Sequence, residues 1–128
     1  SREFCSVNRP RTNTPLQALV TLNDPAFVEA ARVFAQQVLS WKEKSDRHRL
    51  RLAFIMATTR APNDREIHIL TDTLSEQRKE FKTHPERASE FIQNGKSTPS
   101  PDYSPIELAA WTSLASILLN LDETISRE

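Results

Sequence analysis

The sequence predicts an all-α fold, a single bundle of five to six helices built around a central apolar C-terminal helix. Only one glycine, Gly95, occurs among the 128 residues, and so few glycines disfavour a fold rich in positive-φ hairpin turns. The eight prolines all stand where a helix could begin or where no helix is expected, as the cost of an interior proline requires. Apolar residues recur at helical spacing between them.

The composition is that of an ordinary globular protein, and we expect one domain over residues 1–128, long enough to bury about two-thirds of its unfolded surface. Seventeen Lys and Arg balance seventeen Asp and Glu, which gives no support to a nucleic-acid or anionic-membrane partner. No apolar run approaches the roughly 20 residues of a membrane span. The opening, SREFCSVNRP, has the character of an internal segment, so we expect a piece of a larger protein.

The N-terminal third of the chain contains two helix-start signals. Residues 1–13 are predicted to form an extended polar arm, and Thr14-Pro15-Leu16-Gln17 is a capping box that starts a short helix. Asn23-Asp24-Pro25 repeats the combination of cap and proline and starts a second helix, to about Ser40. The predicted apolar face of this helix consists of Phe27, Val28, Ala31, Phe34, Ala35, Val38 and Leu39.

Two further helices are predicted in the middle of the chain. A charged connection over 42–46 precedes a helix at about 47–59, which carries Leu50, Ala53, Phe54 and Ala57 on one side and Leu52, Ile55 and Met56 beside them. Asn63 and Glu66 form a second capping-box pattern, which starts a helix to about residue 82. Its narrow apolar stripe consists of Ile67, Leu70, Leu74, Gln77 and Phe81.

The C-terminal third is predicted to contain a short helix, a loop and the central helix. The short helix covers 85–94 and ends with Gly95 as the first residue beyond it. Residues 96–103 (KSTPSPDY) are predicted to be a flexible loop. The capping box of 104–107 then starts a helix to about Leu121 or slightly beyond. Its apolar residues cover nearly its whole circumference, which predicts burial.

The residue types needed for metal or nucleophilic chemistry are sparse. Cys5 is the single cysteine, and His48, His68 and His84 do not have the spacing of a metal site. We therefore assign no catalytic residue, no metal site and no cofactor to this chain. The histidines are interpreted as surface or cap residues.

Arg2, Arg9, Arg11 and Asn13 are the candidate residues for binding an anion or a partner. They lie on the polar arm just before the helix start at Thr14, where exposed N–H groups and arginine forks can bind an anion. The basic run at 47–51 is interpreted as a solvated helix face, because acidic residues flank it. Asp122-Glu123 is interpreted as an ion-pair site for Arg127 or for an arginine of the arm.

Two blocks, SREFCSVNRPRTNTPLQALVTLNDPAFVEAAR and ELAAWTSLASILLNLDETISRE, resemble the C-terminal part of the planctomycete-specific proteins classed as Domain of Unknown Function 1553. The resemblance covers essentially the whole chain and is weaker over 40–104. It implies a large parent protein that is exported to the periplasm or cell surface. It also implies an N-terminal cytochrome-c-like domain with haem c, and an association with sulfatases and polysaccharide degradation. This chain lacks the haem-attachment motif.

We therefore expect this chain to be a C-terminal helical module that acts as a scaffold or interaction domain. Its expected partners are the upstream domains of the same protein. An alternative is that residues 2–24 contribute to the active site of a polysaccharide-processing or redox multidomain enzyme. A second alternative is a small-anion binding module that uses Arg9, Arg11 and the helix start at Thr14. The oligomeric state is left open.

Overall fold

The computed structural model describes residues 24–42 and 45–127, with the side chains of 122–127 excepted. The described part consists of α2 (Pro25–Leu39), α3 (Asp46–Thr58), α4 (Asp64–Thr83), α5 (Pro85–Ile92) and α6 (Pro105–Arg127). This part contains no strand, so the predicted all-α class is confirmed. The predicted arm over 1–13, the helix start at Thr14 and Cys5 lie outside the described residues.

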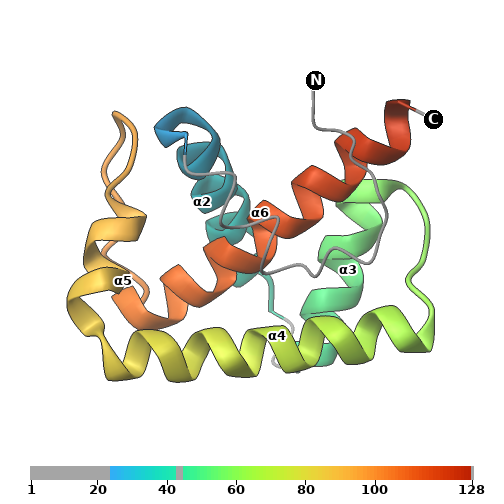
Figure 1. Cartoon of the computed structure of the whole chain (residues 1–128), viewed down its shortest axis with the longest axis horizontal. Coiled ribbons are helices and arrows are strands. Elements are labelled where there is room, and N and C mark those ends of the chain that lie inside the picture. Colours follow the sequence, from blue (N-terminus) through green and yellow to red (C-terminus); the bar gives the residue numbers. More distant parts are fainter. Residues whose placement is uncertain (1–23, 43–44, 128) are drawn as a thin grey trace.

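Helix α6 is the centre of the fold, as its apolar circumference predicts. It packs against α2, α3, α4 and α5, and residues 108–118 are all buried. Figure 1 shows α4 running along one side of the molecule, with α5 near one of its ends and α3 near the other, while α2 lies against α6. The largest buried side chain on α6 is that of Trp111, which is 2% exposed. Each outer helix therefore buries one face against the same central helix.

The helix starts predicted at Asp24 and Asn63 are present in the structure. The Asp24 carboxylate accepts a hydrogen bond from the Phe27 N–H at 3.1 Å and caps α2. At the start of α4, the Glu66 N–H donates to Asn63 Oδ1 at 2.8 Å, and the Asn63 N–H donates to Glu66 Oε1 at 2.9 Å. The reciprocal capping box predicted there is thus confirmed. A polar cap satisfies backbone donors that the first helical turn leaves without partners.

The predicted end of α5 is wrong by two residues. The helix ends at Ile92 rather than Asn94, because the Gln93 N–H donates to the Glu90 carbonyl at 3.3 Å in a tight last turn. The Asn94 side chain also donates to the carbonyl of Phe91, at 2.9 Å. Gly95 has the positive φ expected of it, +93°, but it lies farther from the helix end. Its conformation turns the following loop toward α2.

At the start of α6, Ser104 and Glu107 form the first half of the predicted capping box. The Glu107 N–H donates to Ser104 Oγ at 3.1 Å. The Glu107 carboxylate accepts hydrogen bonds from Arg78 and from Trp111 Nε1. The glutamate that the local sequence pattern assigns to a cap therefore connects α6 to α4. Among the described helices, none combines the length and the apolar character needed to cross a membrane.

Candidate functional site

The four site residues proposed from the sequence, Arg2, Arg9, Arg11 and Asn13, lie outside the described residues. The side chains of Asp122-Glu123 are not described either, so the ion pair proposed for them stays a prediction. The polar clusters and the surface described below come from other parts of the chain.

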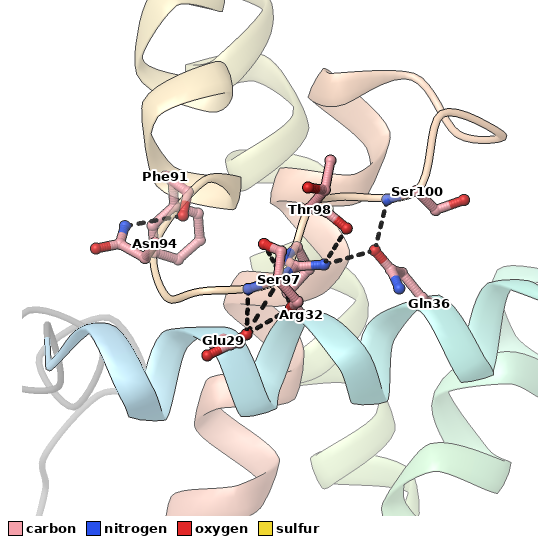
Figure 2. A network of polar contacts seen from close by, with 8 residues as sticks. All are labelled: Glu29, Arg32, Gln36, Phe91, Asn94, Ser97, Thr98 and Ser100. Atoms are coloured by element: carbon pink, nitrogen blue, oxygen red, sulfur yellow. Dashed lines mark hydrogen bonds and ion pairs between the residues drawn. The ribbon is translucent and has the colours of Figure 1, made fainter.

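One polar cluster connects α2 to the loop after α5, and we call it the α2–loop junction. It consists of three side chains of α2 and three loop residues, namely Glu29, Arg32, Gln36, Ser97, Thr98 and Ser100. Figure 2 shows the side chains of Glu29, Arg32 and Gln36 reaching from α2 toward the loop, where they meet Ser97 and the backbone of Thr98 and Ser100. Residues more than sixty positions apart in the sequence meet here.

Arg32 is the buried centre of the α2–loop junction, with 1% of its surface exposed. Its guanidinium donates to Ser97 Oγ at 2.7 Å and to the Ser97 carbonyl at 3.0 Å. It also donates to Gln36 Oε1 at 3.0 Å and to the Thr98 carbonyl at 3.4 Å, while its Nε–H is buried without a partner. A buried cation is costly unless hydrogen bonds and a counter-charge compensate it. The loop supplies much of that compensation.

Ser97 lies between the positive and the negative side chain of the α2–loop junction. Its hydroxyl accepts from Arg32 and donates to the Glu29 carboxylate, and its backbone N–H donates to Glu29 Oε2 at 2.7 Å. These bonds, led by that of the Ser97 hydroxyl and followed by the backbone N–H groups of Ser97 and Lys96, lower the pKa of Glu29. Arg32, whose Nη2 lies 4.0 Å from Glu29 Oε2, adds a smaller effect in the same direction.

Gly95 allows the loop to approach Glu29 this closely. A Cβ atom at this position would overlap the Glu29 side chain, and its φ of +93° is one that other residues rarely adopt. The same region contains a shallow hollow, lined by Asp24, Pro25, Ala26, Glu29, Gly95 and Lys96. Its wall thus carries two carboxylates and one ammonium group, in addition to the apolar ring of the proline.

A second polar cluster connects three helices through Arg78 of α4. The Arg78 guanidinium donates to both carboxylate oxygens of Asp46 on α3, at 2.6 and 3.1 Å, and to both oxygens of Glu107 on α6. Trp111 Nε1 donates to Glu107 at 3.1 Å. The hydrogen bonds that Arg78 donates to Asp46, and then those to Glu107, raise the pKa of Arg78 above its usual range. These groups satisfy one another, which makes the cluster a structural connection between helices.

His68 and His84 both lie close to carboxylate groups. His68 Nε2 is 3.3 Å from Asp72, and His84 lies 4.0 Å from Glu80 and 3.7 Å from Glu86. His84 stands where α4 ends and α5 begins. Within 24–42 and 45–121, no group of three or more His, Cys, Asp or Glu side chains is arranged so that it could hold a metal ion.

The outer face of α3 exposes apolar side chains to solvent. Leu52 is 37% exposed and Met56 is 48% exposed, with the half-buried Ile55 beside them. The prediction that these three residues lie beside the core residues is wrong for Leu52 and Met56, which face solvent. Leu50, Ala53, Phe54 and Ala57 share one face as predicted, and the fold buries that face together with Thr58. Helix α3 thus has apolar residues on two opposite faces, only one of which the fold covers.

Arginines border this outer face. Arg47 and Arg51 are exposed and Arg49 is half-buried. Arg47 lies 3.8 Å from Asp64, where both side chains are well exposed. Basic side chains of this kind were predicted to form a solvated face, and Arg47 and Arg51 do so.

The α2–loop junction was not predicted, although the sequence contains one signal for it. Arg32 occupies a helix position that lies between Val28, Ala31 and Ala35 on the buried face of α2. A charged residue within an apolar stripe requires a specific partner. The partner itself could not be identified, because the loop residues come from a stretch that has no periodic pattern.

The comparisons with known proteins give one family. The family model described as "Protein of unknown function (DUF1553)" matches residues 1–74, a range that includes α2, α3 and the first part of α4. No curated protein and no solved structure matches the chain significantly. The matched range is more than half of the 128 residues, and the chain therefore belongs to the family of proteins of unknown function DUF1553.

Proposed function

We propose that this chain is a helical interaction module of a larger, exported protein and that it docks through the outer face of α3. The observation that carries this proposal is the exposure of Leu52 and Met56 beside Ile55 on that face. Residues three and four positions apart are neighbours on a helix surface, so the three side chains form one continuous stripe. Contiguous apolar surface of this kind is typical of interaction sites, whereas single exposed apolar residues are ordinary.

The cost of leaving this stripe in water supports a docking role. Covering a side chain such as Leu or Met stabilises a complex by about 1.5–3 kcal/mol when burial is complete, and Leu52 and Met56 are already more than half covered. Covering the part of each side chain that is still exposed therefore adds a modest amount of binding free energy. Methionine also adapts its shape to different surfaces, which makes it a common residue of binding faces.

The charges around the stripe indicate the chemistry of the partner. Arg51 is exposed four positions before Ile55 and therefore lies beside the stripe, and the one acidic residue in the first turn of α3, Asp46, is already bound by Arg78. Opposite charges across an interface increase the association rate and select the correct partner. We therefore expect the docking surface to present carboxylates around an apolar centre.

The partner we propose is the remainder of the parent protein. The sequence resemblance described above supports a planctomycete protein that is exported and that carries haem c in an upstream cytochrome-c-like domain. In this proposal, the chain positions the upstream domains and performs no chemistry of its own. The proposal assigns no docking role to Arg9 and Arg11.

Calorimetric titration of this chain with the separately produced remainder of the parent protein tests the proposal. Leu52→Glu and Met56→Glu should each weaken binding at least tenfold, because a carboxylate would be buried among apolar groups and acidic neighbours. Ile69→Glu is the matched control, since Ile69 on α4 is 37% exposed, as Leu52 is. Arg9→Ala and Arg11→Ala should bind like the wild-type chain. Equal affinity of the Leu52, Met56 and Ile69 variants would contradict the assignment.

A further inference from the structure

We propose that the α2–loop junction is an acid-sensitive contact, which binds the 96–103 loop to α2 near neutral pH and releases it when Glu29 is protonated. The junction joins a side chain that titrates in acid to a loop that has no helical structure of its own. The proposal concerns this local opening and is independent of the docking role of α3.

Glu29 is the acceptor on which one end of the loop depends. Its Oε2 accepts both the N–H and the hydroxyl of Ser97, and Arg32 Nη2 lies 4.0 Å away. A carboxylate accepts such bonds about twice as strongly as a neutral oxygen. A protonated Glu29 would lose its charge and part of its accepting capacity in the same step, which would weaken both bonds to Ser97.

Protonation would also change the environment of Arg32. The acceptors of its guanidinium are neutral oxygens of Gln36, Ser97 and Thr98, while Glu29 supplies the nearby negative charge. Arg32 is 1% exposed, and a buried cation without a counter-charge is strongly unfavourable. Movement of the loop away from α2 would give water access to the guanidinium and would relieve this cost.

The other charged groups around Glu29 do not replace its role. Asp24 and Lys96 line the same hollow as Glu29. The Asp24 carboxylate is bound to the Phe27 N–H as the cap of α2, and Lys96 is a cation on the loop itself. Neither group supplies a negative charge to Arg32 in place of Glu29.

The direction of the pH effect follows from the lowered pKa of Glu29. A carboxyl group whose pKa is lower in the folded state stabilises that state at pH values above its ordinary pKa, which is 4.5 for Glu29. This contribution is lost as the pH falls from 4.5 through the lower, folded-state value. Opening of the loop is therefore expected below pH 4.5, while at neutral pH the loop stays bound.

Residue-resolved hydrogen exchange on the whole chain tests this inference, with each rate divided by the intrinsic rate at the same pH. The Ser97 amide should be protected at pH 7 and should lose protection at least tenfold below pH 4.5, while α6 amides stay protected. Glu29→Gln, which mimics the protonated side chain, should show the same loss at pH 7. Glu86→Gln, an exposed carboxylate of α5, is the control and should behave like wild type.

Two results would overturn the inference. One is a Ser97 amide that is equally protected in wild type and in Glu29→Gln at pH 7. The other is a simultaneous loss of protection in the loop and in α6 as the pH falls, because acid would then unfold the whole domain rather than open the junction.

Discussion

Arg32 and Ser97 are separated by 65 positions in the sequence and are joined by two hydrogen bonds from one guanidinium nitrogen. Nη2 of Arg32 donates to the Ser97 hydroxyl at 2.7 Å and to the Ser97 carbonyl at 3.0 Å. The same guanidinium, through Nη1, reaches Thr98. A loop that the sequence predicts to be flexible thus has specific bonds to a buried arginine.

Replacement of Arg32 measures what this arrangement contributes to stability. Arg32→Ala removes the hydrogen bonds to Ser97 and Thr98 and opens space in a buried position. We expect the free energy of unfolding in urea to fall by about 2–4 kcal/mol. Arg47→Ala is the control, because Arg47 is 68% exposed, and its cost should stay below about 0.5 kcal/mol. Similar effects of the two substitutions would contradict the role given to Arg32.

Gly95→Ala tests the close approach of the loop to α2. The new Cβ atom would overlap the Glu29 side chain and would stand at a φ of +93°. We expect a destabilisation of about 1–3 kcal/mol and faster hydrogen exchange at Ser97. Lys96→Ala changes the exposed neighbour of Gly95 and should leave both measurements near wild type. A Gly95→Ala chain with wild-type stability would show that the turn has another cause.

Arg78→Ala tests the connection between α3, α4 and α6. It removes the bonds of Arg78 to Asp46 and Glu107, whose side chains are 39% and 36% exposed. Solvent screens such partly exposed charges, so we expect a cost of about 1–2 kcal/mol in urea denaturation. Arg87→Ala removes an exposed pair with Glu80 on α4 and should cost at most about 0.5 kcal/mol. If Arg87→Ala lowers the free energy of unfolding as much as Arg78→Ala does, the Arg78 cluster stabilises the fold no more than an exposed ion pair.

Thr59→Gly should stabilise the chain. Thr59 is a β-branched residue that ends α3 with a φ of +64°, a conformation that glycine adopts without strain. The expected gain is about 0.5–1 kcal/mol, seen as a higher midpoint of thermal unfolding. Thr83→Gly, at the last position of α4, should instead destabilise by a similar amount. A lower midpoint for Thr59→Gly would contradict the proposed strain.

The sequence predicts most of this fold because helix starts depend on neighbouring residues. Asp24, Asn63 and Ser104 each accept a hydrogen bond from the N–H three positions later, so short sequence motifs predict these caps. The apolar circumference of α6 likewise predicts its central place. Both signals are local, and both are confirmed.

The candidate sites are less predictable because they depend on contacts between distant segments. No local pattern indicates that Ser97 binds Arg32 or that Glu107 turns from its cap toward Arg78. The exposed side of α3 was also not predicted, since Leu52 and Met56 are as apolar as the residues that face the core. Only packing of the other helices decides which face is covered.

Oxidation of Met56 tests the proposed docking function most directly, because it is the single methionine among the 128 residues and it is 48% exposed on α3. Mass spectrometry after peroxide treatment gives its oxidation rate in this chain alone and in the complete parent protein. If α3 docks on the rest of the protein, Met56 should react at least tenfold more slowly in the complete protein. Equal rates in the two proteins would contradict the proposal that the outer face of α3 is a docking surface.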